Sequence, residues 1–490
     1  MHFFKILALS VGVCWNLLAF ASVDQYFNAI KTEPNALYTF LKKMPKGGEL
    51  HYHLAGGAYP EHMLAIAARE HYCLDKQTLA VSKIIEHCNG LEVKEIAQYQ
   101  QIYDKTIAAW SMKNFIAGAE SSHDHFFNTF DKFIPIVTAY SPELLAEVMQ
   151  RAAAQHEQYL EIMILPDDAH SISFGTPDLL SKNFATAKNE LLANKDFQRN
   201  IDFSIKEAQA LLQKARKNLG CDNDNRQGAC QLTVKFQYYI LREQPLEKVF
   251  AQALTAFAAA ARSTDIVGIN LVQAEDGFIS LRDYRKQMSI INFLHHAYPS
   301  VHISLHAGEL NQELVAPWDL NFHIQEAINQ GHAERVGHGT AIAFEENAEE
   351  LLKKMAEHAI AVEINLTSNR KILNVYGQNH PLSYYLKHQV PVVLSTDDEG
   401  VLRTDLTREY QIAVLEHHVD YPTLKQISRN ALTYSFLPGK SLWAQPSQAK
   451  LVPECQDLDS SSCKQFLAQN AKAKLQWQLE QQFHQFEAQY

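Results

Sequence analysis

The stretch "KGGELHYHLAGG", residues 46–57, decides how the rest of the chain is interpreted, because it holds two histidines one residue apart on a β-prone run. Side chains alternate between the two faces of a strand, so His51 and His53 point the same way. Two imidazoles on one face suit a metal ion. An isolated H-x-H pattern also fits a hydrogen-bonded core pair or a polar edge strand. The rest of the chain has to distinguish these interpretations.

Further β-rich runs follow and alternate with segments rich in Ala, Leu, Lys and Glu. Together with the first run they predict eight strands, at Glu49–Leu54, Tyr159–Leu165, Leu232–Leu241, Asp265–Val272, Val301–His306, Glu334–Gly337, Ile360–Leu366 and Pro391–Thr396. Strands that alternate with helices form parallel sheets, and closing eight of them into a barrel leaves no exposed edge. The sequence therefore predicts an α/β fold, a (β/α)8 TIM barrel. The sixth strand is short and polar, and its pattern alone would not identify it.

The barrel is expected over residues 44–440, with additional segments around it. Residues 22–43 predict an N-terminal helical extension that is broken at Pro34. About a hundred residues separate the first two strands, which is too long for a bare loop, so a helical insertion or cap is expected at about 60–135. Residues 441–490 predict a loop followed by a polar C-terminal helix.

The first 21 residues, "MHFFKILALSVGVCWNLLAFA", have the pattern of a cleaved export signal: an early lysine, an apolar run and a final Ala-Phe-Ala. A membrane anchor is the alternative, but the apolar run is short for a span. Without this segment, six of the 7 cysteines remain, in the close pairs Cys73/Cys88, Cys221/Cys230 and Cys455/Cys463. Such pairs in an exported chain predict local disulfides. We therefore expect a periplasmic or secreted protein with no membrane segment after signal removal.

The amino-acid composition limits the classes of molecule that this chain is expected to bind. The chain has 490 residues, 47% hydrophobic and 20% charged, and a formal net charge of -11. This profile is typical of a folded globular protein. Nucleic acid is not an expected partner, because binding its phosphates needs clustered Lys and Arg.

Several of the predicted strands end in residues that can carry chemistry. The fifth ends in "SLHAGE", with His306 and Glu309, and the sixth in "RVGHGT", with His338. The eighth ends in "LSTDDE", with Asp397 and Asp398. Each motif alone fits a loop residue or a helix cap. Barrel enzymes, however, place their active sites at the C-terminal ends of the strands, and all of these groups fall there.

Together these groups predict a zinc hydrolase. Three imidazoles and a carboxylate suit one Zn²⁺ per chain, which lowers the pKa of a bound water to about 7. The predicted ligands are His51, His53, His306 and Asp397. Glu309 lies three residues past a ligand and is the expected acid, and His338 is the expected second base or charge partner. Asp398 is free to bind a substrate group.

The motifs "MPKGGELHYHLAGG", "SLHAGE", "RVGHGT", "LTSN" and "LSTDDE" resemble, in this order, the adenosine deaminase family of zinc amidohydrolases. The N-terminus and the cysteine-bearing insertion look most like the secreted, growth-factor-type members. The resemblance implies hydrolytic deamination of adenosine or 2′-deoxyadenosine to inosine and ammonia. It further implies that Glu309 donates a proton to purine N1, His338 orients the hydroxide and Asp398 accepts a hydrogen bond at N7. By analogy with the secreted relatives, the N-terminal helices could form a homodimer surface.

Two positions depart from the family pattern. Many members have an aspartate at the position of Ala55, where it meets the ribose, and a glycine at the position of Gln273, close to purine N3. Another aminopurine, a modified adenine, or a role as a nucleoside-binding, growth-factor-like signalling protein therefore stays open. Gln273 and Trp110 are further candidates for substrate contact, although aromatic runs such as that around Trp110 more often pack in a core. Glu275 fits either the site or an ordinary loop.

Overall fold

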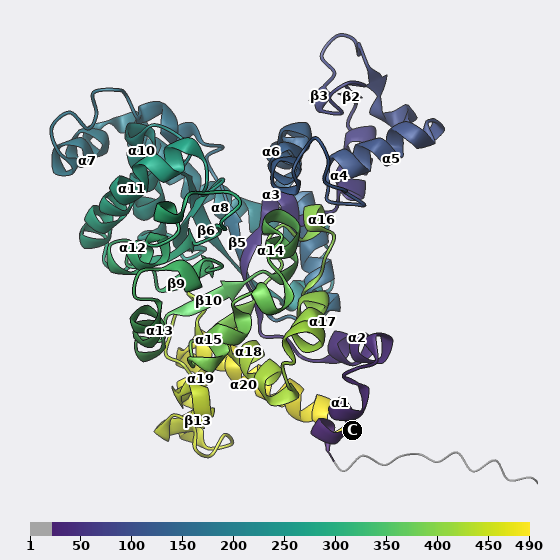
Figure 1. Ribbon diagram of the computed structural model, residues 1–490, viewed down its shortest axis with the longest axis vertical. Coiled ribbons are helices and arrows are strands. Elements are labelled where there is room, and N and C mark those ends of the chain that lie inside the picture. The colour runs from purple at the N-terminus through teal and green to yellow at the C-terminus, as the bar shows by residue number, and fades with distance from the viewer. Residues whose placement is uncertain (1–21) are drawn as a thin grey trace, which may run out of the picture.

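Eight parallel strands form the centre of the computed structural model, which describes residues 22–490 (Figure 1). The predicted signal peptide lies outside the described residues. In spatial order the strands are β1 (Gly48–His53), β5 (Tyr159–Ile164), β6 (Thr233–Leu241), β7 (Ile266–Val272), β8 (His302–Ala307), β9 (Arg335–His338), β10 (Ala361–Ile364) and β11 (Val392–Leu394). A parallel bridge between Tyr52 in β1 and Asp397 after β11 closes the ring. The predicted TIM barrel is confirmed.

The predicted strands are all present, with ends that differ by no more than about two residues. Strands such as β5 are buried along their whole length, as expected where helices cover a parallel sheet. The short, polar β9 is also buried, because Arg335 forms ion pairs with Glu161 and Glu363 inside the barrel. This pairing explains why a charged residue is tolerated in a core strand.

Helices surround the barrel and connect successive strands (Figure 1). They are α7 (Phe184–Ala193), α8 (Lys195–Asn218), α9 (Gly228–Gln231), α10 (Leu246–Ala260), α11 (Phe278–Ala297), α12 (His323–Asn329), α13 (Ala348–Glu357), α14 (Leu366–Leu373), α15 (Leu382–Lys387), α16 (Glu399–Leu402), α17 (Leu406–His417) and α18 (Tyr421–Thr433). The alanine-rich α10 is the most deeply buried of those between β6 and β8, and its small side chains allow close contact with both β6 and β7.

The segment between β1 and β5 projects from the barrel (Figure 1). It contains α3 (Leu54–Gly57), α4 (Pro60–Arg69), β2 (Tyr72–Leu74), β3 (Val81–Lys83), β4 (Leu91–Glu92), α5 (Gln100–Ala109) and α6 (Ser122–Ala154). The prediction of a helical insertion is incomplete, because β2, β3 and β4 form a small antiparallel sheet. These strands have three residues or fewer, too few to show alternation in the sequence. The long α6 bends at Tyr140, between Pro135 and Pro142.

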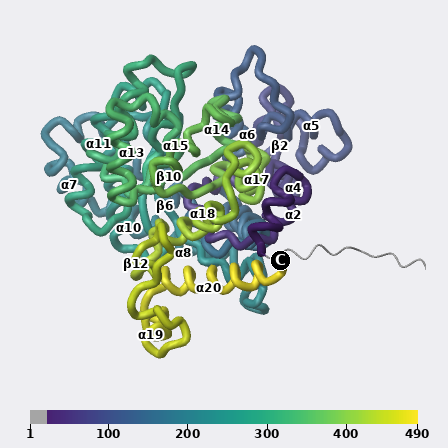
Figure 2. The backbone as a smooth tube through the Cα atoms, turned by 60° about the horizontal axis from the view of Figure 1, so that its bottom comes forward, coloured from purple at the N-terminus to yellow at the C-terminus, as the bar shows by residue number. Residues whose placement is uncertain are grey.

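The two ends of the described chain pack together. Helices α1 (Val23–Ile30) and α2 (Pro34–Lys43) lie against the C-terminal helix α20 (Ala471–Glu487), next to α18 (Figure 2). The rings of Phe40 and Phe486 are 5.0 Å apart. The predicted single C-terminal helix is in fact two, α19 (Ser461–Gln469) and α20, because Asn470 has an extended backbone. A hairpin of β12 (Trp443–Gln445) and β13 (Lys450–Leu451) precedes them.

The six cysteines of the described chain form three disulfides, paired as the sequence predicts: Cys73–Cys88, Cys221–Cys230 and Cys455–Cys463. Each closes a short local loop. Across residues 22–490, none of the helices combines the length and the apolar character needed to cross a bilayer.

Candidate metal centre and active site

The closure of the barrel brings the first candidate ligands together. Asp397 donates its backbone N–H to the carbonyl of His51, and His53 donates its N–H to the carbonyl of Asp397. The same pairing that joins β1 to the segment after β11 therefore places both histidines beside the aspartate. Asp397 has a φ of 67°, in the left-handed region. Such strain in a non-glycine residue is concentrated at functional sites.

Four of the predicted ligands converge on one point. The ligand atoms of His51, His53, His306 and Asp397 all lie within 4.8 Å of one another. His53 Nε2 is 3.2 Å from both Asp397 Oδ1 and His306 Nε2. Burial lowers the pKa of His53 to about 4 and that of His306 well below its usual value, so both rings are neutral, as metal ligands must be.

Two residues that the sequence analysis missed fix the orientation of these rings. His51 Nδ1 is 2.7 Å from Glu363 Oε2, and His306 Nδ1 is 2.9 Å from Asn270 Oδ1. Both oxygens accept, so each ring carries its proton on Nδ1 and presents Nε2 to the cluster. His51 Nε2 is buried and has no hydrogen-bond partner among the described residues. A set of three converging imidazole nitrogens and one carboxylate oxygen fits Zn²⁺.

Charges beneath the cluster hold Glu363 in its ionised form. Arg335 lies between Glu363 and Glu161, and Ser304 donates a further hydrogen bond to Glu363 at 2.8 Å. Burial alone would raise the pKa of Glu363, but the Arg335 guanidinium and His51 hold it at about 2. The histidine ligand is thus supported by a fixed carboxylate.

Glu309 lies beside the cluster on a loop that a second buried carboxylate fixes. Glu275 accepts the backbone N–H of Gly308 at 3.0 Å and that of Glu309 at 2.7 Å. It also pairs with His323 Nδ1 at 2.6 Å. Burial, with the Asp397 charge nearby, raises the pKa of Glu309 to about 8. At neutral pH its carboxyl therefore holds a proton. Glu275, which the sequence left undecided, belongs to the site through this contact.

His338 ends β9 with a φ of 65°, and its ring lies at the edge of the cluster. Its Nε2 is 3.9 Å from Asp397 Oδ2, is buried, and has no hydrogen-bond partner among the described residues. Asp398 Oδ1 is likewise buried without a partner. A side chain at Gly56 would clash with Asp398, since a Cβ there would be 2.0 Å from this oxygen. The glycine therefore leaves room for the Asp398 carboxyl.

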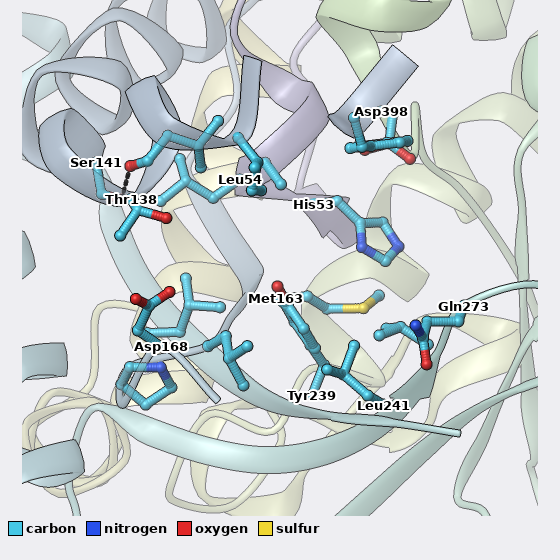
Figure 3. Close-up of a pocket in the computed structure, with 18 of the residues that line it drawn as sticks. His53, Leu54, Thr138, Ser141, Met163, Asp168, Tyr239, Leu241, Gln273 and Asp398 are labelled. Carbon is cyan, nitrogen blue, oxygen red and sulfur yellow. Dashed lines mark hydrogen bonds between the residues drawn. The ribbon is translucent and has the colours of Figure 1, made fainter. Parts of the chain in front are cut away.

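These groups line one end of a cavity of about 950 Å³ (Figure 3). His53, Asp398 and Gln273 lie at this end, and the cavity extends past Met163 and Tyr239 towards Thr138, Ser141 and Asp168. Helix α6 forms one wall with its aromatic residues Phe126, Phe127 and Phe130. The insertion thus covers the mouth of the barrel.

The two remaining candidates differ in position. Gln273 lines the cavity with a φ of 81°, and its Oε1 accepts the N–H of Glu243 at 2.9 Å. Trp110 is a correction to the sequence analysis. It is fully buried within the insertion, donates its indole N–H to the carbonyl of Leu79, and is absent from the cavity lining. Of this aromatic run, Phe126, Phe127 and Phe130 lie in the cavity wall, whereas Trp110 lies in a core.

The chain matches the model of the adenosine deaminase family over residues 111–444. An adenosine deaminase from Klebsiella pneumoniae subsp. pneumoniae is 37% identical over 137 residues, which are 28% of this chain and 38% of that relative. The crystal structure of Arabidopsis ADAL complexed with IMP is 18% identical with a TM-score of 0.54, and covers 91% of this chain and 99% of ADAL. An amidohydrolase from Burkholderia ambifaria with bound Zn is 16% identical with a TM-score of 0.51, covering 90% of this chain and 94% of that chain. The two structural comparisons, at 18% and 16% identity, show a shared fold alone.

Proposed function

This chain belongs to the adenosine deaminase family, and we propose that it is a zinc-dependent hydrolase that converts adenosine or 2′-deoxyadenosine to inosine and ammonia. The observation that carries the proposal is the convergence of His51, His53, His306 and Asp397 beside Glu309, at one end of a cavity. Zinc, when bound there, supplies a nucleophile at neutral pH by lowering the pKa of water.

The chain's own residues account for the proton movements. The attacking water would lose one proton to solvent before it reacts, and its oxygen then adds to C6 of the purine while Glu309 gives its proton to N1, so that no charge builds up on the ring. The Glu309 carboxylate next takes the proton of the new C6 hydroxyl and passes it to the amino group, which leaves as ammonia as the C6 carbonyl forms. Glu309 regains its proton from solvent. His338 Nε2, which has no hydrogen-bond partner within residues 22–490, faces the region where the attacking oxygen must lie.

Asp398 would donate the hydrogen bond to purine N7, whereas the sequence analysis expects it to accept one there. Purine N7 can only accept a hydrogen bond, so the group that faces it must donate. Burial, with the neighbouring Asp397 charge, raises the pKa of Asp398 well above its usual value. Its carboxyl therefore holds the proton that this hydrogen bond requires.

The charges around the cavity favour a nucleoside over a nucleotide. Lys214 is the one lysine in the lining formed by the described residues, and no arginine accompanies it. Four carboxyl side chains away from the metal cluster line the same cavity: Asp131, Asp168, Glu207 and Glu243. A 5′-phosphate would meet like charges, which oppose binding by several kcal/mol. We expect kcat/KM for adenosine to exceed that for AMP by at least about 100-fold.

Export is part of the proposal. Three disulfides are typical of proteins that fold in an oxidising compartment, and the pattern of residues 1–21 fits an export signal. Together they support a periplasmic or secreted enzyme. Fractionation of the native host, with the mature N-terminus identified by mass spectrometry, tests this part.

The decisive experiment combines metal analysis with a deamination screen over adenosine, 2′-deoxyadenosine, adenine, N6-methyladenosine, guanine and AMP. We expect one zinc per chain and release of ammonia from adenosine. Glu309→Gln should retain zinc and lose turnover, since the amide has no proton to give. Glu313→Gln, which changes an exposed carboxyl four residues away, should keep full activity. Zinc-loaded protein that deaminates neither adenosine nor 2′-deoxyadenosine would refute the proposal.

A further inference from the structure

A chain of hydrogen bonds runs from the backbone of α15 to the ring of His338, and its direction is fixed. We propose that Asn369 and His380 are positioning residues that keep the proton of His338 on Nε2, the nitrogen that faces the metal cluster. The inference deepens the proposed function, since it assigns the residues that prepare His338 for the reaction.

The direction is set at the backbone. Leu382 donates its N–H to His380 Nδ1 at 3.1 Å. A backbone amide can only donate, so His380 Nδ1 accepts and the proton of this ring is on Nε2. His380 is almost fully buried, and burial lowers its pKa to about 3, so the ring is neutral. Its Nε2 is therefore a donor and its Nδ1 an acceptor.

The next step orients an amide. His380 Nε2 donates to Asn369 Oδ1 at 2.9 Å. With its oxygen used in this way, Asn369 turns its Nδ2 towards His338 Nδ1, which is 3.0 Å away. Asn369 is fully buried, so water cannot replace either partner. Turning the amide around would place two donors, the Asn369 NH2 group and His380 Nε2–H, against each other.

The other groups near His338 Nδ1 also indicate that this nitrogen accepts a hydrogen bond. A second amide nitrogen, Asn365 Nδ2, is 3.5 Å from the same ring nitrogen. Glu309 Oε1 is 3.6 Å from it, which is beyond hydrogen-bond range. His338 Nδ1 is thus an acceptor, and the neutral ring carries its proton on Nε2. That proton points at the region of the attacking oxygen.

Because the backbone also holds His338 with a φ of 65°, both the ring position and the proton are set before substrate arrives. A ring with its proton on Nδ1 would present a lone pair at Nε2 instead of a donor. In hydrolases whose catalytic histidine is held in the wrong tautomer, kcat falls by about 10⁴. The chain from Leu382 to His338 excludes this state.

The test replaces the donor to His338 Nδ1 by an acceptor. Asn369→Asp has nearly the same shape, but both of its oxygens accept, so it should draw the proton of His338 to Nδ1. We would record ¹⁵N NMR spectra of zinc-loaded, histidine-labelled protein and identify the His338 signals by their absence in His338→Gln. Asn430→Asp is the matched control, because Asn430 is also buried but donates to the carbonyl of Val392.

We expect an Nε2-protonated His338 in the unmodified protein and in Asn430→Asp, and protonation at Nδ1 in Asn369→Asp. In the latter, kcat should fall by at least about 100-fold while KM and zinc content change less than about twofold. His380→Leu, which removes the donor to Asn369, should give a mixture of tautomers. Protonation at Nδ1 in the unmodified protein overturns the proposal without any variant. These spectra do not need turnover, so they test it even if the deaminase function fails.

Discussion

Glu275 acts on a catalytic residue without reaching the substrate. Its oxygens accept the two backbone N–H groups that precede the Glu309 side chain, and His323 pairs with it from α12. Glutamine at this position would keep the shape but turn an NH2 group towards a backbone N–H, since one of its ends only donates. The loop that carries Glu309 would then have to move.

We therefore expect Glu275→Gln to lower kcat about 10- to 100-fold, with zinc content unchanged. Steady-state kinetics with metal analysis measures this. Glu345→Gln is the matched control, because Glu345 is also buried and accepts the backbone N–H groups of Ile324 and Gln325, away from Glu309. Equal losses in the two variants would show that Glu275 has only a structural role.

A second buried carboxylate predicts a pH effect on stability. Burial raises the pKa of Glu409 from 4.5 to about 7, although Thr367 and Thr404 donate hydrogen bonds to it. Between about pH 4.5 and pH 7, Glu409 therefore keeps its proton in the folded chain and has lost it in the unfolded chain. The contribution of Glu409 is thus fully present below about pH 4.5 and is lost as the pH rises through about 7. The shift corresponds to a loss on the order of 3 kcal/mol.

Replacing the carboxyl removes this pH effect. We expect Glu409→Gln to match the unmodified protein in free energy of unfolding at pH 4.5, and to exceed it at pH 8. Denaturant unfolding at the two pH values measures the difference. Parallel pH curves for the two proteins would show that Glu409 does not titrate in this range.

Single residues of the site differ in how far the sequence could predict them. His306 ends a predicted strand and Asp397 follows another, so the strand prediction alone places both ligands at one end of the barrel. Glu363 and Asn270 lie within buried strands and act on His51 and His306 from neighbouring positions of the barrel. Which inward positions meet depends on strand register and tilt, and a pattern of alternating residues does not specify these.

Among elements, predictability follows the pattern around each strand rather than its length. The barrel strands alternate with helices, so the sequence predicts all eight, including the three-residue β11 and the short, polar β9. The strands of the β2, β3 and β4 sheet are too short to show a pattern of their own, and the Cys73–Cys88 disulfide and contacts with α6 hold the sheet in place. Helix α6 includes Pro135 and Pro142, which predict interruptions. It continues through Pro135 but bends at Tyr140, just before Pro142, and its buried face packs against α4 and α8.

The small sheet should depend on its disulfide. Cys73–Cys88 closes a loop of 15 residues, and loop-closure entropy gives such a bridge about 3 kcal/mol. We expect the double variant Cys73→Ser/Cys88→Ser to be cleaved faster by protease within residues 72–98, with little change in kcat. Cys455→Ser/Cys463→Ser removes a bridge near the C-terminus and is the control. Equal cleavage of both variants at residues 72–98 would contradict the expectation.

At the scale of the whole molecule, the candidate metal site joins distant parts of the chain. Its ligands come from β1, from β8 and from the segment after β11, which are the first, fifth and last positions in the ring. A parallel bridge between Tyr52 and Asp397, with its flanking backbone hydrogen bonds, links β1 to this last segment. A bound ion would therefore hold the first and last strands of the barrel together, in addition to its role in the reaction.

Metal removal should consequently destabilise the entire barrel. A ligand that binds only the folded chain, at a concentration 1,000 times its Kd, stabilises it by about 4 kcal/mol. We expect chelation to lower the midpoint of thermal unfolding by at least about 5 °C, and added Zn²⁺, but not Mg²⁺, to restore it. His53→Ala should lose most of this zinc-dependent gain, because it removes one of four ligands, whereas His302→Ala, at an exposed histidine on β8, should keep it. A chelated protein that unfolds at the same temperature as the zinc-loaded one would show that the closure is complete without the ion.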